Sequence, residues 1–354
     1  MPQAKEHHRI PQVYLKAWGD SVWVYDKSKK TSIFRNIDSI LYTKFYHSIM
    51  PGDLFTLPDS LNLFFSSLDP YMVSFPLDNG KELLLDKKEL LNIYWFERDK
   101  WIIKDTSGKI LPRAQRNQLL TSISQKKDNQ IEEAWSNEYE TVWGETIRII
   151  NETIRNIHFS KNGAMKYEDA QKLMKFFTMF RWRSIQGPEQ LKETFDKFIS
   201  MFPEEIKSID SMAIGHREDK LFLDDIWHGI LLKYFHAFLS GTGPIQQEYE
   251  KMLKNTTFIF RIDTANRLIT TDNPCFQHID TEGIIWPTFI ALPGLLVQLA
   301  KKDPDHPYEY RILDMSDKEV NDFNALVFER GNIIISTNEL SYEYIEDVLH
   351  NKHL

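Results

Sequence analysis

The sequence contains very little cysteine and no long hydrophobic run. Its single cysteine, Cys275, cannot form a disulfide bond within the chain, which argues against a disulfide-stabilised secreted fold. The most apolar stretch, residues 284–299, is shorter than the roughly 20 residues that span a bilayer and is interrupted by Pro287, Pro293 and Gly294. The charged N-terminal segment also lacks the apolar core of a signal peptide. We therefore expect a cytoplasmic protein without a transmembrane segment.

Two common classes of binding motif are missing as well. Neither glycine-rich phosphate loop, G-x-G-x-x-G or G-x-x-x-x-G-K-S/T, occurs, and one cysteine cannot build a zinc site from cysteine ligands. The 43 Lys and Arg residues are outnumbered by 51 Asp and Glu residues, giving a formal net charge of −8. This charge argues against generic binding of nucleic acid or anionic lipid over the whole surface, but it leaves room for a local basic site.

The composition is that of a globular chain with an aromatic core. Hydrophobic residues make up 42% of the 354 residues, and 9 Trp, 14 Tyr and 23 Phe provide large side chains to bury. Strand-like pieces at both ends flank a helical centre, which predicts an α+β fold: a central helical body packed against a mixed sheet built from N-terminal and C-terminal strands. We expect one large domain over residues 1–354; the alternative divides the chain into 1–110, 111–255 and 256–354.

Hydrophobic periodicity gives the expected positions of the elements. Apolar residues at intervals of three and four predict helices at 87–98, 113–124, 130–157, 167–184, 188–201, 223–239, 317–330 and 338–350. Short β-type runs predict strands at 21–27, 31–34, 257–262, 267–270, 289–299 and 332–336. Repeated Pro, Gly, Asp and Ser residues between positions 46 and 80 predict a loop-rich connection.

Two imidazoles and a guanidinium precede an apolar anchor near the N-terminus. His7, His8 and Arg9 are residue types that bind phosphate or a metal, but adjacent residues of an extended chain point to opposite faces. We select His8 as a catalytic residue because Pro11 stiffens the chain beside it, and Arg9 as a substrate-binding residue. The alternative is a solvated arm held in place by Tyr14 and the apolar residues that follow it.

Arg181 is the most informative single residue of the helical centre. It follows Met174 by seven positions and Phe177 by four, which predicts a place in the middle of an apolar stripe, with Arg183 on the other side. A buried guanidinium needs a carboxylate, backbone carbonyl groups or a bound anion. We therefore consider Arg181 either as half of a structural ion pair or as a substrate-binding clamp for phosphate or carboxylate.

Glu132 is the expected partner of Arg181 and a predicted catalytic residue. It shares a helical face with Trp135 and Tyr139, an unusual setting for a carboxylate. A local explanation competes with catalysis, because Asn129 three residues earlier is a typical N-cap and Glu132 would then complete a capping box.

A third group of polar residues follows a predicted C-terminal strand. In Thr271-Asp272-Asn273-Pro274 the acid stands at a junction between strand and turn, where rigid and accessible catalytic carboxylates often lie. We predict Asp272 as a catalytic residue and as a ligand of a divalent metal such as Mg²⁺ or Mn²⁺, with Asp26 as a second ligand and Asn273 in contact with substrate. The alternative is an Asx-turn that binds its own backbone.

Several of these segments carry a family resemblance. The pattern His-His-x-x-Pro-x-x-Tyr-Leu at residues 7–15 and Val-Trp-Val-Tyr-Asp-Lys at 22–27 resemble the opening of the uncharacterised, mostly bacterial DUF4238 family. Ile131-Glu132, the helix around Arg181 and the Thr-Asp-Asn-Pro motif fit the same pattern, so the resemblance spreads over nearly the whole chain. The family pattern often carries a second acid seven positions after the first, where this chain has Tyr139. The resemblance implies a fold shared with other unannotated proteins and no established activity.

Two functions are compatible with these residues. If the fold brings together His8, Asp26, Glu132, Arg181 and Asp272, they supply the groups that phosphoryl chemistry requires. The first hypothesis is a metal-assisted hydrolase of phosphodiesters or nucleotides, a nuclease-like effector of a bacterial defence or toxin system that binds nucleotide or nucleic acid at a local site. The second is a non-enzymatic sensor or protein-interaction module, in which the same polar groups form a buried network that fixes the fold.

Overall fold

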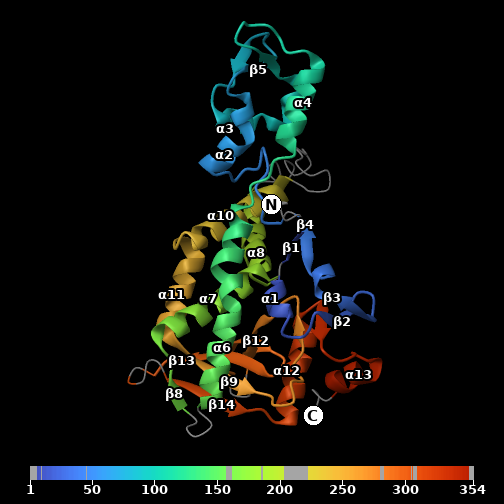
Figure 1. Cartoon of the computed structure of the whole chain (residues 1–354), viewed down its shortest axis with the longest axis vertical. Coiled ribbons are helices and arrows are strands. Elements are labelled where there is room, and N and C mark those ends of the chain that lie inside the picture. Colours follow the sequence, from blue (N-terminus) through green and yellow to red (C-terminus); the bar gives the residue numbers. More distant parts are fainter. Residues whose placement is uncertain are drawn as a thin grey trace. The chain divides into compact units, whose positions relative to one another are not determined.

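Helices and strands are interleaved along the chain in an α+β fold, as the sequence predicts (Figure 1). The computed structural model describes residues 6–8, 10–44, 46–156, 162–184, 186–202, 222–279, 283–303, 305 and 309–350. Two compact units are each assembled from separate parts of the chain. Unit 1 contains residues 46–133 and 192–239, and unit 2 contains residues 4–45, 134–191 and 240–354.

Unit 1 combines helices with a small antiparallel sheet. Its sheet has the strand order β6-β5-β7. The bounds of its elements are α2 Pro58–Phe65, β5 Met72–Pro76, β6 Glu82–Leu84, α3 Lys88–Ile93, β7 Ile102–Lys104, α4 Arg113–Ser124 and α10 Phe222–Leu239. Helix α8, Gln186–Ser200, and helix α5, Gln130–Trp135, each cross a boundary between the two units.

The loop-rich connection predicted between residues 46 and 80 is wrong in part, because α2 and β5 lie in it. Pro58 occupies the first turn of α2, where its missing N–H costs nothing. Leu61, Phe64, Phe65 and Leu68 follow at helical spacing, and all four are buried. Proline and serine therefore mark the start of a helix here and not a long irregular segment.

Unit 2 contains two larger sheets and one short pair of strands. The antiparallel sheet β10-β15-β2-β3 joins both ends of the chain, because Asp26 of β2 pairs with Ile333 of β15 and Trp23 with Ser336. The predicted sheet from N-terminal and C-terminal strands is thereby confirmed, but this sheet is antiparallel and not mixed. The strands are β1 Glu6–His8, β2 Ser21–Asp26, β3 Thr31–Asn36, β4 Tyr42–Lys44, β10 Thr270–Thr271 and β15 Ile333–Ser336.

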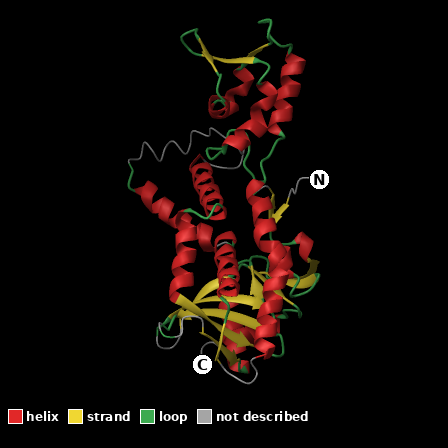
Figure 2. Ribbon diagram, turned by 60° about the vertical axis from the view of Figure 1, so that its left-hand side comes forward, coloured by secondary structure: helices red, strands yellow, loops and turns green. Residues whose placement is uncertain are grey.

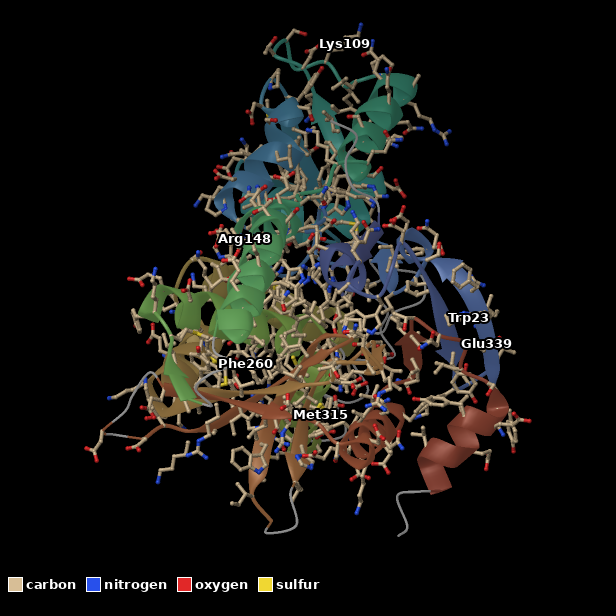
Figure 3. The ribbon with its side chains drawn as sticks, turned by 60° about the horizontal axis from the view of Figure 1, so that its bottom comes forward. Trp23, Lys109, Arg148, Phe260, Met315 and Glu339 are labelled. Atoms are coloured by element: carbon tan, nitrogen blue, oxygen red, sulfur yellow. The ribbon has the colours of Figure 1, made fainter. Side chains whose placement is uncertain are left out.

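The larger sheet of unit 2 has the order β11-β12-β13-β9-β14-β8 and is antiparallel except between β9 and β14. The strand predicted at 289–299 is instead a hairpin, because Pro293 and Gly294 turn the chain between β12 and β13. Phe260 of β9 is fully buried, and Trp23 belongs to the other sheet (Figure 3). The strands are β8 Asn162–Ala164, β9 Thr256–Ile262, β11 Cys275–Ile279, β12 Ile285–Leu292, β13 Leu295–Lys301 and β14 Glu309–Asp314.

The helices of unit 2 supply most of its aromatic core. Helices α7 and α11 pack against each other, and they also contact β11 and β9 respectively. Figure 2 shows helices, in red, lying next to the larger yellow sheet. The helix bounds are α1 Gln12–Leu15, α6 Thr141–Asn156, α7 Tyr167–Arg183, α11 Gly243–Asn255, α12 Asp317–Arg330 and α13 Tyr342–His350. A π-helical turn, Ser136–Glu140, connects α5 to α6.

Tyr14 anchors the N-terminal segment in unit 2. Its ring lies 4.7 Å from that of Phe180 and 5.8 Å from that of Phe289, measured between centroids. Its hydroxyl group is 2.6 Å from Thr270 Oγ1 and donates to the carbonyl oxygen of Ile290, also at 2.6 Å. Tyr14, six positions after His8, is therefore part of the core of unit 2.

Candidate functional site

The N-terminal motif has a defined backbone. His7 and His8 belong to β1, where His8 pairs with Tyr42 of β4. The side chains of both histidines and the whole of Arg9 lie outside the described residues. The catalytic role of His8 and the substrate-binding role of Arg9 stay predictions.

Asp26 ends β2 and binds the turn that follows. Its Oδ1 accepts hydrogen bonds from the amide and the hydroxyl group of Ser28, at 3.0 and 2.6 Å, and its Oδ2 accepts one from Lys29 Nζ at 2.7 Å. These bonds, the one from Lys29 first, lower the pKa of Asp26 to about 2. The carboxylate is thus held ionised as part of a tight hairpin.

Asp272 and Asn273 bind other segments of unit 2. The buried Asp272 accepts hydrogen bonds from Thr271 Oγ1 at 2.7 Å and from the amide of Asn332 at 3.0 Å. Its burial raises the pKa of this carboxyl group above the ordinary value, although the hydrogen bonds act in the opposite direction. Asn273 Oδ1 accepts a hydrogen bond from Ser184, the residue that caps α7, at 3.1 Å. The motif therefore ties α7 to the start of β15.

The two predicted metal ligands lie on either side of β15. Asp26 pairs with Ile333, and the amide of Asp272 donates to the carbonyl oxygen of the same residue at 3.1 Å. Two strand spacings of about 4.8 Å separate the backbones of the two acids by about 10 Å. Each carboxylate is engaged in the hydrogen bonds given above, and within the described part of the chain no three His, Cys, Asp or Glu residues form a group that could hold a metal ion.

The order of the two arginines on α7 is the reverse of the prediction. Arg183 is fully buried, whereas 22% of the Arg181 side chain is exposed. The expectation failed because α7 has no single apolar stripe: most residues from Leu173 to Phe180 are buried, so the helical phase does not select Arg181. Arg181 pairs with Glu248 of α11 and not with Glu132.

Among the described residues of unit 2, Arg183 and Glu140 form the most buried ion pair. Its Nη1 lies 2.8 Å from Glu140 Oε1, and its guanidinium carbon lies 5.6 Å from the centroid of the Trp135 ring. Glu140 ends the π-helical turn, which carries one residue more than an α-helical turn. Glu140 therefore takes the helical phase that position 139 would have in a regular α-helix. Tyr139 itself is buried, and its burial raises the pKa of its hydroxyl group.

Glu132 binds a histidine that the sequence analysis did not single out. Its Oε2 lies 2.5 Å from His47 Nδ1. The His47 side chain is fully buried against the rings of Tyr46 and Phe235, whereas 15% of the Glu132 side chain is exposed. The two residues are 85 positions apart, and no local spacing connects them.

Neighbouring bonds in unit 1 hold the two segments of this pair together. Ile49 and Asp128 exchange backbone hydrogen bonds, both at 2.9 Å. Asn129 Oδ1 accepts from Ser48 Oγ at 2.5 Å, and the amide of Gln130 donates to Asp128 Oδ1 at 2.9 Å. Asp128 therefore accepts a hydrogen bond from a backbone amide in the first turn of α5, and the carboxylate of Glu132 contacts His47.

Such a pair has a defined chemistry. A carboxylate at Nδ1 of an imidazole fixes the ring orientation and favours the proton on that nitrogen. Glu132 is the partly exposed member of the pair, with 15% of its side chain exposed, whereas the His47 side chain is fully buried. Of the predicted catalytic residues whose side chains the structure describes, Glu132 is the one with a titratable partner.

A comparison with protein-family models finds one that covers residues 6–338, described as a protein of unknown function (DUF4238). The chain belongs to the DUF4238 family. The DUF4238 match includes the N-terminal motif, Glu132, Arg181 and the segment around Asp272, and it confirms the resemblance drawn from them. Searches of curated proteins and of solved structures gave no match. Within the described residues of this DUF4238 chain, no helix is long and apolar enough to cross a bilayer.

Proposed function

We propose that this DUF4238 chain is a hydrolase of phosphodiesters or nucleotides, in which Glu132 is the general base and His47 its positioning residue. The observation that carries the proposal is the 2.5 Å contact between Glu132 Oε2 and a fully buried imidazole. Glu132 would take a proton from an attacking water molecule while the ring holds the carboxylate in one orientation. The role of an effector in a bacterial defence or toxin system belongs to the same proposal.

The remaining predicted groups stay predictions beside this proposal. His8 is the predicted proton carrier of the N-terminal motif, and Arg9, Arg181 and Asn273 are predicted substrate contacts. All four belong to unit 2, and the proposed proton transfer to Glu132 of unit 1 does not use them. Asp26 and Asp272 do not fit a two-carboxylate metal centre as they stand, because two strand spacings separate their backbones and because both oxygen atoms of Asp26 and Oδ1 of Asp272 accept hydrogen bonds within the protein. Mg²⁺ and Mn²⁺ are therefore variables of the assay, and the proposed proton transfer does not depend on them.

A specific observation favours the second candidate, a non-enzymatic sensor or interaction module. In unit 2 the buried Asp272 and the buried Arg183 both bind other segments of the protein, as a network that fixes the fold would. In that case the predicted residues serve stability, and recognition lies elsewhere on the surface.

Hydrolysis assays with matched variants separate the two candidates. Purified protein is incubated with labelled DNA, RNA and nucleotides, in the presence of Mg²⁺, Mn²⁺ or a chelator. A general base contributes about 10²- to 10⁴-fold, so Glu132→Gln should reduce turnover by at least 100-fold. Glu133→Gln is the control, because it removes the same charge from an exposed neighbouring position.

Thermal unfolding of each variant separates lost chemistry from a lost fold. His47→Gln should reduce turnover less than Glu132→Gln does, because the base itself remains. Equal turnover in Glu132→Gln and the wild type would contradict the proposed base. No turnover of any substrate by the wild type would leave the interaction module as the better candidate.

A further inference from the structure

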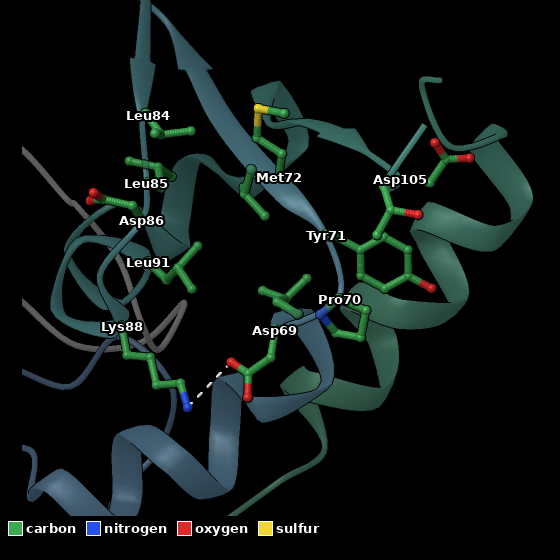
Figure 4. Close-up of a pocket in the computed structure, with 13 residues that line it drawn as sticks. Asp69, Pro70, Tyr71, Met72, Leu84, Leu85, Asp86, Lys88, Leu91 and Asp105 are labelled. Atoms are coloured by element: carbon green, nitrogen blue, oxygen red, sulfur yellow. Dashed lines mark ion pairs between the residues drawn. The ribbon is translucent and has the colours of Figure 1, made fainter. Parts of the chain in front are cut away.

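Unit 1 contains a cavity that none of the predicted catalytic residues reaches. Its volume is about 440 Å³, within the range of about 300 to 1,000 Å³ that is usual for sites of small molecules. Strand β5, the end of β6 and the start of α3 surround it (Figure 4). Tyr71 lines this cavity and also a second cavity of about 390 Å³.

The floor of the cavity is apolar. Four buried side chains from different elements line it: Leu68, Val73, Leu85 and Leu91. Met72 and Leu84 continue this surface toward solvent, with 49% and 46% of each residue exposed. The cavity therefore offers an apolar surface that a ligand body can cover.

The rim of the cavity is acidic. Asp69, Asp86 and Asp105 line it together with a single cation, Lys88. Lys88 Nζ already lies 3.3 Å from Asp69 Oδ1, and hydrogen bonds led by the one from Ser107 lower the pKa of Asp105. Within the described residues, no hydrogen bond or ion pair joins Asp86 to another group. Figure 4 shows the Asp69–Lys88 pair below the cavity and Asp86 and Asp105 on opposite sides of it.

We propose that this cavity binds a small organic cation, an amine carried on an apolar or aromatic body. The apolar floor would cover the body of the ligand, and Asp86 would receive its ammonium group. Charge complementarity selects the sign, because the lining has three carboxylates and one ammonium group. An anionic ligand of the same shape would meet unfavourable charge at every side of the rim except Lys88.

Three indoles of one shape and different charge provide the test. Isothermal titration calorimetry compares tryptamine, the neutral tryptophol and the anionic indole-3-acetate on the full chain. Tryptamine should bind at least tenfold more tightly than tryptophol, and indole-3-acetate should give no measurable heat. Absence of binding by tryptamine, or equal affinities for tryptamine and tryptophol, would overturn the proposal.

Two substitutions with opposite expected effects assign the binding to this cavity. Asp86→Asn should weaken tryptamine by about three- to fivefold, the range of a partly exposed ion pair. Lys88→Met should strengthen it by a similar factor, because it removes the competing cation and releases Asp69. Asp99→Asn, an exposed acid outside the lining, should change nothing. Tryptamine affinity that is unchanged in Asp86→Asn, or lower in Lys88→Met, would place the binding elsewhere and refute the assignment.

Discussion

The two arginines near the end of α7 should differ in how strongly they are coupled to their carboxylate partners. Arg183 is fully buried and its partner Glu140 is 19% exposed, whereas Arg181 and Glu248 are 22% and 26% exposed. The same chemical pair thus occurs twice on one helix, at two depths. We predict a larger coupling energy for the deeper pair, because water screens its attraction less.

The expected magnitudes follow from that difference in exposure. A hydrogen-bonded pair with a fully buried guanidinium should show a coupling of about 2 to 3 kcal/mol. The shallower pair should show about 0.5 to 1 kcal/mol, near the upper range for exposed pairs.

Two double-mutant cycles measure these couplings. One uses Arg183→Met and Glu140→Gln, the other Arg181→Met and Glu248→Gln, each with its double variant. Urea unfolding is followed by tryptophan fluorescence and by circular dichroism, and coincidence of the two signals tests two-state behaviour. Equal coupling energies, or a larger one for Arg181 and Glu248, would refute the prediction that the more buried pair is coupled more strongly.

Three further predictions concern single positions of unit 2. Because burial raises the pKa of Asp272, the ionised carboxylate destabilises the fold increasingly as the pH rises from about 4 through the pKa of the folded state. Asp272→Asn should therefore raise the melting temperature at pH 7, with a smaller gain near pH 4. An equal loss at both pH values would contradict this. A methyl group on Gly331 would lie 1.6 Å from Thr271 Oγ1, so Gly331→Ala should lower the unfolding free energy by about 2 to 3 kcal/mol, whereas Gly144→Ala, in open space on α6, should raise it by about 0.5 to 1 kcal/mol. Urea unfolding checks both, and a stable Gly331→Ala protein would count against the close approach. Tyr14→Phe removes a buried hydroxyl with two bonds and should cost about 1 to 2 kcal/mol in the same assay; a cost below about 0.5 kcal/mol would contradict it.

Local periodicity was sufficient to predict most of the helices. Arg113–Ser124 and Asp317–Arg330 have the predicted bounds, and the second begins with a capping box between Ser316 and Glu319. Helix α2 was missed because proline and serine were interpreted as loop residues. The spacing of Leu61, Phe64, Phe65 and Leu68 is the signal that could have identified it.

The partners of polar residues depend on tertiary packing and were harder to predict. Glu132 was selected, but His47 was not, since a lone histidine 85 positions away has no spacing to connect it. The phase of Arg183 could not be read from α7, because most residues from Leu173 to Phe180 are buried and do not define a single apolar stripe. The π-helical turn before α6 likewise shifts the helical phase of Glu140 by one residue. Such a turn has no characteristic residue type, so it could not be predicted from the sequence.

The pairing of β2 with β15 has a consequence during protein synthesis. At about 5 to 20 residues per second, the roughly 300 residues between the two strands take about 15 to 60 s to emerge from the ribosome. Through that interval the hairpin of β2 and β3 presents an edge that later receives β15, and a two-stranded hairpin alone is only marginally stable. The β2–β3 hairpin is thus made early and completed late, and until β15 emerges its open edge could pair with a strand of another chain.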